Sequence, residues 1–350
     1  MNIQEMIQNI EALHKESQER AIYHLNHLTK PISSLGRLEE LAVQLAGISQ
    51  DPFAQYKDKR VVIMAADHGV VAEGVSAFPQ EVTPQMVQNF LNHGAAINVM
   101  TKTVGASVVC VDVGVASDIS SFEGMIHKKV AFGTKNFAKE PAMTEQEVWQ
   151  AIEVGIQVAK EQIEDGAKVL ATGEMGIGNT TPSSAVLSVL ANIEPINVVG
   201  AGTGLNQEQV KHKANVIKQA IELHKPNRED AVDVLQKVGG LELAALCGLC
   251  LGAAIMKTPI VIDGFISTVS ALCAATISPN AKAYMIPSHH SVEPGHTNAL
   301  QALGLQAYFP LNMRLGEGTG ATITFPMIDM ASNIMREMAS FESAGVTNKE

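Results

Sequence analysis

The sequence has few charged residues and few aromatic residues, and each shortage excludes a class of protein. Charged residues make up 17% of the 350 residues, below the roughly 25% of an average soluble protein, while hydrophobic residues reach 46%. Such a chain can bury a large core in one or two domains, which excludes global disorder. Lys and Arg total 25 against 36 Asp and Glu, with no basic block. This acidic balance, together with an aromatic content of only 4%, argues against a nucleic-acid partner.

Long apolar runs and cysteine clusters are also scarce. The longest apolar run, residues 243–256, spans 14 residues, whereas a bilayer requires about 20, so we expect a core helix there and no membrane partner. The N-terminal residues lack the pattern of a signal peptide. Cys247 and Cys250 have zinc or redox spacing, but no second pair or nearby His completes a site. We expect Cys110, Cys247, Cys250 and Cys273 to be buried, reduced thiols in a cytoplasmic protein.

Short β-branched runs that end in Gly- or Asp-containing loops alternate with segments of helical spacing. Because these runs are continuously apolar, they are typical of a parallel sheet covered on both faces. We therefore predict an α/β fold with a mostly parallel, Rossmann-like sheet and helices on both faces. The predicted strands are residues 61–66, 107–113, 168–172, 196–199, 259–262 and 283–286.

The two ends of the chain differ from this central part because their apolar residues recur at helical spacing. We predict that residues 1–34 and 326–350 form a small helical domain beside an α/β catalytic domain of residues 35–325. The alternative is that these helices pack against a second subunit. The helical stripes lie in residues 3–13, 35–45 and, after Pro326, 327–338.

Glycine-rich and polar loops follow five of the predicted strands. Ligands of an open parallel sheet bind beyond the carboxyl ends of its strands, so we expect these loops to meet at one edge. The loops are Asp67-His68-Gly69, residues 173–181, residues 200–204, Asp263-Gly264-Phe265 and residues 288–291.

The loop of residues 173–181 has the features of an anion site. Its glycines allow several N–H groups to point one way, and residues 179–181 can cap a helix that starts near Pro182. Together they present free donors and a positive dipole end to a phosphate. Neither this loop nor residues 200–204 has the dinucleotide fingerprint, and no P-loop lysine is present. A mononucleotide phosphate therefore fits better, with an ordinary strand-to-helix turn as the alternative.

A glycine-flanked carboxylate is a candidate general base, and a histidine cluster is a candidate metal site. Glu317 lies between two glycines in an apolar stretch, where partial desolvation would raise its pKa and make it a usable base near neutral pH. An exposed turn residue is the plain alternative. His289-His290 with Glu293 and His296 resembles a metal site, but the spacing matches no standard one. We predict no metal.

Seven segments of the chain, distributed nearly from end to end, match the motifs of one family in order. They are residues 30–39, 66–70, 173–181, 238–240, 263–265, Ser288-His289 with Glu293, and residues 314–321. The chain thereby resembles the nicotinate-nucleotide–dimethylbenzimidazole phosphoribosyltransferase family, which makes the lower-ligand nucleotide of cobalamin. Two departures are Ser33 and His93, which stand where the family usually has glycine.

The resemblance implies a displacement at the anomeric carbon of nicotinate mononucleotide. A nitrogen of 5,6-dimethylbenzimidazole attacks C1 of the ribose from the α face and nicotinate leaves, giving α-ribazole 5′-phosphate with inversion. Glu317 would take the proton from the attacking heterocycle, and Glu174 would lie by the ribose or the developing cation. The family implies a homodimer, and neither substrate requires a metal or an organic cofactor.

The same resemblance implies two groups of substrate-binding residues. Phosphate and ribose would be held by Gly176, Gly178, Asn179, Thr180, Gly202, Thr203 and Lys213. Without the resemblance, Lys211 is as good a candidate for the counter-charge of the phosphate as Lys213. Lysines at these positions are equally compatible with a solvated helix face. The benzimidazole requires an apolar pocket with one polar handle, for which Phe78, Met86 and Leu315 are the candidates, although plain core residues would look the same.

Two other functions remain open at the level of sequence. One is an NAD-dependent oxidoreductase on a similar sheet, which would require a dinucleotide fingerprint and an acidic residue about 20 positions further on. The other is a non-catalytic ribonucleotide-binding protein.

Overall fold

One parallel sheet forms the centre of the molecule. The computed structural model describes residues 3–202 and 204–347, and within them six strands form this sheet. They are β1 (Lys59–Ala66), β2 (Ser107–Gly114), β3 (Ile126–His127), β4 (Val169–Met175), β5 (Ile260–Ile262) and β6 (Met285–Pro287). Their order is β3-β2-β1-β4-β5-β6, and every neighbouring pair is parallel. This is the order of the Rossmann fold, so the predicted fold class is confirmed.

Five of the six predicted strands are confirmed, with ends shifted by a few residues. The predicted strand at residues 196–199 is wrong, because the structure has a 3₁₀ turn there that starts at Pro195. The N–H groups of Val198 and Val199 both donate to the Pro195 carbonyl, so they are not available to a sheet. Both valines are buried in the core, which accounts for the strand-like composition.

Helices surround this sheet. In the described residues the α-helices are α1 (Ile3–Gln8), α2 (Lys15–His27), α3 (Arg37–Ser49), α4 (Val82–Leu91), α5 (Ala96–Thr103), α6 (Glu145–Glu164), α7 (Thr180–Leu190), α8 (Gln207–His224), α9 (Ala231–Val238), α10 (Leu241–Ile255), α11 (Phe265–Ile277), α12 (Pro294–Leu303), α13 (Thr319–Glu337) and α14 (Phe341–Ala344). The 3₁₀ helices are η1 (Gly69–Glu73), η2 (Pro195–Asn197) and η3 (Pro279–Tyr284).

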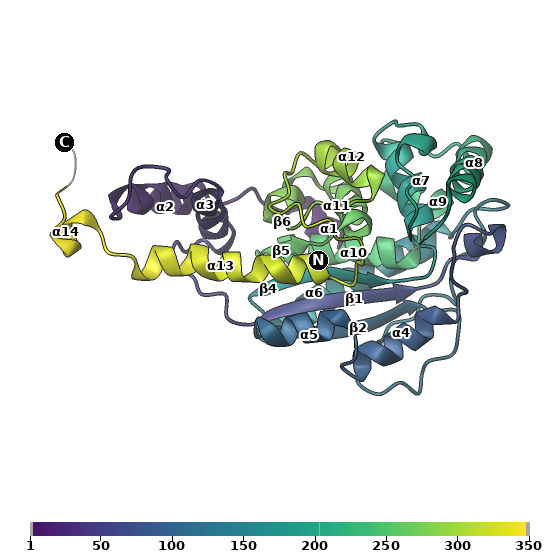
Figure 1. The fold of residues 1–350 in the computed structure, drawn as a ribbon, viewed down its shortest axis with the longest axis horizontal. Coiled ribbons are helices and arrows are strands. Elements are labelled where there is room, and N and C mark those ends of the chain that lie inside the picture. The colour runs from purple at the N-terminus through teal and green to yellow at the C-terminus, as the bar shows by residue number, and fades with distance from the viewer. Residues whose placement is uncertain (1–2, 203, 348–350) are drawn as a thin grey trace.

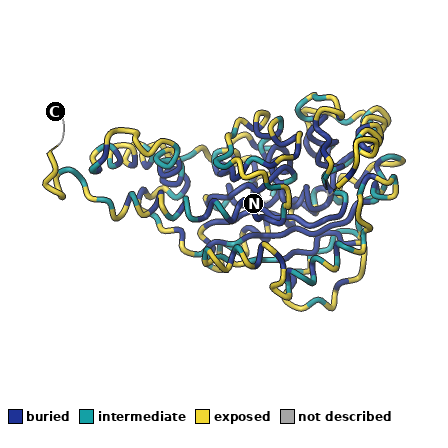
Figure 2. The backbone as a smooth tube through the Cα atoms, in the orientation of Figure 1, coloured by how far each residue is buried: buried dark blue, intermediate teal, exposed yellow. Residues whose placement is uncertain are grey.

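The helices divide between the two faces of the sheet. Helices α4, α5 and α13 pack on one face (Figure 1). Helices α10 and α11 pack on the other face, and α6 packs against α10. Successive residues of β1 point to opposite faces, so Val62 and Met64 belong to one core while Val61 and Ile63 belong to the other. Figure 2 shows this burial concentrated along the strands and the helices that face them.

Helix α10 confirms the predicted core helix, since every residue from Leu241 to Ala254 is buried. Among the described residues, no helix combines the length and apolarity that crossing a membrane requires. All four cysteines are free and buried, as predicted. Burial raises the pKa of Cys110 and of Cys273 to about 12.

Helices α6 and α10 approach each other so closely that glycine is required at the contact. A Cβ added to Gly248 would lie 2.0 Å from the carbonyl oxygen of Ile152, which is backbone and cannot move alone. We expect Gly248→Ala to lower the free energy of unfolding by about 3 kcal/mol. The urea midpoint measures this, with exposed Gln157→Ala on α6 as control; an unchanged midpoint would contradict the packing argument.

Helices α2 and α3 lie beyond one end of the sheet, where they pack against each other and against α13, whereas α1 packs against α10 (Figure 1). The domain boundaries predicted there remain a prediction. Helix α13 starts at Thr319 and passes through Pro326, so the expectation of a helix only after Pro326 is corrected. Ser33 and His93, which depart from the family pattern, have φ of 59° and 57°, in the region that glycine adopts without strain.

Candidate active site

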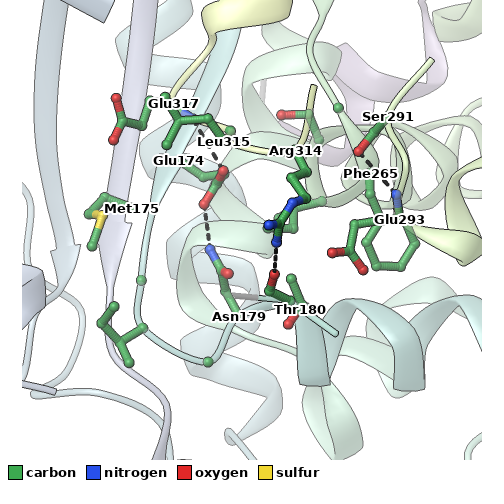
Figure 3. A pocket seen from close by; sticks show the side chains of 18 of the residues that line it. Glu174, Met175, Asn179, Thr180, Phe265, Ser291, Glu293, Arg314, Leu315 and Glu317 are labelled. Carbon is green, nitrogen blue, oxygen red and sulfur yellow. Dashed lines mark hydrogen bonds between the residues drawn. The ribbon is translucent and has the colours of Figure 1, made fainter. Parts of the chain in front are cut away.

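A cleft of about 880 Å³, its open mouth included, lies at the carboxyl ends of β4, β5 and β6. Its walls are formed by the loops that follow these strands, the segment after η1, the loop between η2 and α8, the segment before α13 and one residue of α8. Of the five loops expected to meet at this edge, four contribute to the cleft, whereas Asp67-His68-Gly69 follows β1 and does not line it. Figure 3 shows Glu317 and Met175 on one side of the cleft and Glu293 and Phe265 on the other. The cleft thus has two ends with different chemistry.

Glu174 and Glu317, 143 residues apart in the chain, meet at one end of the cleft. The Glu317 N–H donates to Oε1 of Glu174 at 3.4 Å, as the dashed line in Figure 3 shows. Both side chains are about 6% exposed. Among residues 3–202 and 204–347, none donates a hydrogen bond to Oε2 of Glu317, which is buried. A buried acceptor without a donor is ready to receive a proton or hydrogen bond from a ligand.

Burial shifts the acidity of both carboxyl groups in the same direction. Burial first, and then the negative charge of Asp263, raise the pKa of Glu317 to about 7. The pKa of Glu174 is also raised well above its usual range, chiefly by burial and then by Asp263. Glu317 is therefore a base that changes its protonation near neutral pH, the range in which general bases are most effective.

The loop that leads into α7 differs in detail from the prediction. Helix α7 starts at Thr180, and Asn179 occupies the N-cap position without a capping bond from its side chain. The Asn179 amide instead donates a short hydrogen bond to Oε2 of Glu174. The buried Glu174 carboxyl group requires a hydrogen-bond partner, and the Asn179 amide supplies one. Asn179 therefore orients Glu174 in addition to starting the helix.

Gly176 is required where this loop crosses the end of β1. A Cβ at this position would lie 2.3 Å from the carbonyl oxygen of Ala66 and 3.1 Å from Nε2 of His68. His68 lies behind the loop and pairs with Glu242 of α10, Nε2 to Oε1 at 2.8 Å, with both side chains buried. Burial alone lowers the pKa of His68, but the Glu242 carboxylate outweighs it, so the pKa is raised. The buried His68–Glu242 pair therefore packs against the loop at Gly176.

The other end of the cleft carries a buried cation. Lys213 of α8 is fully buried and its Nζ donates to Oγ1 of Thr180 at 2.7 Å. Burial lowers the pKa of Lys213 to about 8. Gly202 has φ of 53° and approaches the same threonine closely. A buried ammonium beside a helix N-terminus is an arrangement that favours a phosphate.

Arg314 and Glu293 also line this end, and sequence reasoning did not select either as a site residue. Nη1 of Arg314 donates to the Gly202 carbonyl at 2.9 Å. Glu293 is buried, and its desolvation raises the pKa of its carboxyl against the opposing charges of Lys213 and Arg314. Their positions in family motifs were visible in the sequence, but only the fold shows that they meet.

The structure brings most of the predicted residues to the cleft. Those that line it are Glu174, Gly176, Gly178, Asn179, Thr180, Gly202, Lys213, Leu315 and Glu317. Phe78 and Met86 are not among the residues that line it. Phe78 is 47% exposed, and Met86 packs against the core that contains Val61 and Ile63 of β1. Thr203 lies outside the described residues.

The histidines after β6 have structural partners. Nδ1 of His296 accepts from the Ser291 N–H at 2.8 Å, and its Nε2 pairs with Oγ1 of Thr268 at 3.0 Å. Burial lowers the pKa of His296 to about 3, so the ring is neutral. Within the described part of the chain, no cluster of three or more His, Cys, Asp or Glu side chains is placed to hold a metal ion.

The fold and the cleft define an α/β enzyme that holds an anionic substrate beside a buried base. A family model described as phosphoribosyltransferase matches residues 10–346. The chain belongs to the nicotinate-nucleotide–dimethylbenzimidazole phosphoribosyltransferase family, and relatives of that name are similar along their whole length. The relative from Halalkalibacterium halodurans is 50% identical over 99% of this chain and 96% of its own. The relative from Chloroflexus aurantiacus is 49% identical over 99% of both chains.

A solved structure agrees with this assignment. The crystal structure of nicotinate-nucleotide–dimethylbenzimidazole phosphoribosyltransferase from Thermus thermophilus is 41% identical and has a TM-score of 0.90. It covers 95% of this chain and 99% of its own. The comparisons support neither an NAD-dependent oxidoreductase nor a non-catalytic ribonucleotide-binding protein.

Proposed function

We propose that this phosphoribosyltransferase moves the phosphoribosyl group of nicotinate mononucleotide to 5,6-dimethylbenzimidazole, in the assembly of the cobalamin nucleotide loop. The observation that carries the proposal is the pairing, in one cleft, of a buried base with a buried phosphate-type site: Glu317 at one end and Lys213 with Thr180 at the other. The relatives that match along the whole chain carry the same activity in their names.

The donor binds with its phosphate at the Lys213 end of the cleft. Thr180, the first residue of α7, and Gly202 lie beside Lys213, and Gly176 and Gly178 line the same cleft. The ribose then extends toward Glu174, which lies beside Glu317. Although burial raises the pKa of Glu174, the pyridinium charge of the donor favours the ionised carboxylate, which in turn stabilises a developing oxocarbenium ion.

The acceptor binds at the Glu317 end, where Met175 and Leu315 supply apolar lining. One nitrogen of the benzimidazole forms the new bond to C1 of the ribose, while the bond from C1 to nicotinate breaks. The proton on the other nitrogen passes to Glu317, so the product leaves neutral at its ring. Attack from the face opposite nicotinate inverts C1. The flat, apolar acceptor matches a pocket with one polar handle.

A turnover assay tests the function directly. The purified protein is mixed with nicotinate mononucleotide and 5,6-dimethylbenzimidazole, and both products are separated and quantified. We expect α-ribazole 5′-phosphate and nicotinate in equal amounts. Omitting the benzimidazole should abolish both products. Release of nicotinate without α-ribazole phosphate would instead indicate a hydrolase, and no reaction at all would overturn the proposal.

The pH dependence of kcat/KM follows from the two shifted groups. Below pH 7 Glu317 is protonated and cannot accept a proton, because its pKa is raised to about 7. Above pH 8 Lys213 loses its positive charge, because its pKa is lowered to about 8. We therefore expect a narrow bell-shaped profile with its maximum between these values. Initial rates at low donor concentration measure it, and a flat profile between pH 6 and 9 would contradict both assignments.

We also propose that the enzyme is a cytoplasmic homodimer that pairs through its terminal helices. Ile22 and Tyr23 of α2 and Met330 of α13 are large apolar side chains that remain exposed in the single chain, and such surfaces mark contact sites. The four free thiols suit a reducing compartment. Light scattering of the purified protein measures the oligomeric state.

A further inference from the structure

The segment that carries Glu317 has an uncommon backbone. Gly316, Glu317 and Gly318 follow one another with φ of 82°, 64° and 87°. Glutamate rarely adopts such values, because its Cβ is crowded in the left-handed region. Gly318 is the N-cap of α13 and makes no side-chain capping bond of its own. Something outside the segment must therefore hold this conformation in place.

Asp263, at the carboxyl end of β5, supplies the missing cap from another part of the chain. Its Oδ2 accepts from the Gly318 N–H at 3.1 Å, and its Oδ1 accepts from the Ala321 N–H at 2.9 Å. Ala321 is the third residue of α13, whose N–H an N-cap side chain normally receives. The two bonds follow directly after Glu317, and the positive end of the helix dipole favours the carboxylate charge.

Asp263 is itself fixed by the strands on either side. Its N–H donates to Oγ1 of Thr172 on β4 at 3.0 Å, and its carbonyl accepts from Oγ of Ser288 after β6 at 3.1 Å. The Asp263 side chain is 2% exposed. The cap is therefore built on the rigid sheet and not on a mobile loop, which is the arrangement that holds a reactive group most accurately.

We propose that Asp263 is the positioning residue for Glu317: it caps α13 in place of Gly318 and thereby holds the Glu317 carboxylate toward the acceptor. The inference rests on the proposed role of Glu317 as proton acceptor. Asp263 acts through Glu317 and does not touch the reacting atoms. Its removal affects the chemical step more than the binding of the donor, because the phosphate site lies at the other end of the cleft.

The charge of Asp263 has a second effect on the same base. After burial, it is the cause that raises the pKa of Glu317, so its neutralisation lowers that pKa and moves the acidic limb of the rate profile to lower pH. The other titratable and charged groups around this position are Glu174 on β4, His289 after β6, whose Nδ1 is 4.0 Å from Oδ1 of Asp263, Glu242 of α10, Lys213 and Arg314. These groups are unchanged in an Asp263 variant.

Steady-state kinetics of Asp263→Asn test the proposal. We expect kcat to fall about 10²-fold, the scale of a slightly misplaced catalytic group, while KM for nicotinate mononucleotide stays within about threefold. The acidic limb of the rate profile should move to lower pH. In the Glu317→Gln background, Asp263→Asn should cause no further loss of kcat, because the two residues act as one unit. Asp118→Asn is the matched control, since exposed Asp118 also accepts from a backbone N–H.

A normal kcat with an unmoved acidic limb in Asp263→Asn would overturn the proposal, as would fully additive losses in the double variant. If Asp263→Asn loses its cooperative thermal transition, the variant does not fold and the proposal is tested with Thr172→Val instead. That variant keeps the carboxylate but removes the acceptor of the Asp263 N–H, so kcat should fall about tenfold with the acidic limb unmoved; an unchanged kcat would overturn the proposal. An inactive wild-type enzyme would refute the proposed function instead.

Discussion

Glu317→Gln is expected to lower kcat by about 10²-fold or more, the range that a general base contributes, with the affinity for nicotinate mononucleotide nearly unchanged. Glutamine keeps the shape of the side chain but cannot accept a proton from the benzimidazole. Oε2 of Glu317 has no donor among the described residues, so the substitution breaks no hydrogen bond to that oxygen. The loss should therefore fall on the chemical step and not on folding.

Rapid-quench measurements of α-ribazole phosphate, together with donor titration by calorimetry, separate these two effects. Glu337→Gln, an exposed residue near the end of α13, serves as the control for a neutralised carboxylate on the same element. The acidic limb of the pH profile should also disappear in Glu317→Gln. A variant that turns over at the wild-type rate would remove Glu317 from the mechanism.

Lys213→Met is expected to weaken the binding of nicotinate mononucleotide by about 10²-fold. Removing one partner of a buried, hydrogen-bonded charge pair costs about 3 kcal/mol, and each 1.4 kcal/mol corresponds to roughly a tenfold change in affinity. Lys213 is fully buried beside Thr180, so its charge is poorly screened by water. Methionine fills much of the same volume without the ammonium group, which limits the damage to the core.

The chain offers a matched control two residues away. Lys211 lies on the same helix but is exposed, so Lys211→Met should leave the affinity for the donor within a factor of about two, since surface charges contribute little. Isothermal titration with nicotinate mononucleotide measures both variants. The basic limb of the pH profile should vanish only in Lys213→Met. Equal affinities in the two variants would place the phosphate elsewhere.

The strands were predictable where the hydrophobic pattern was unambiguous. Residues 61–66 and 107–113 are rich in valine and other apolar residues, and both belong to strands of the observed sheet. The run at 196–199 has the same composition, yet its backbone hydrogen bonds return to Pro195. Val198 and Val199 are buried as their composition indicates, although Ile196 is exposed. Strand pairing was not predictable, because apolar composition does not show how the N–H groups of a segment are paired.

The sequence predicted most of the residues that line the candidate site, but it did not predict the contacts between their side chains. Glu317 and the loop at 173–181 were selected from glycine spacing and family motifs, and both line the cleft. The orientation of Asn179 toward Glu174 was not foreseen, since helix capping and a buried carboxylate compete for the same amide. Phe78 lies after β1 as expected but does not line the cleft, because chain proximity to a strand end does not fix a side-chain direction.

The sequence by itself determined the parallel α/β sheet, the edge at which the cleft lies, the family, and Glu174 and Glu317 as carboxylates of the cleft. These properties depend on local composition and on the order of motifs along the chain, and both are visible in the sequence without any three-dimensional structure. Only the tertiary structure decided which lysine is buried beside Thr180 and which aspartate caps the helix after Glu317. Lys211 and Lys213 are chemically identical, and their difference arises solely from desolvation, which exists only once distant segments have packed together.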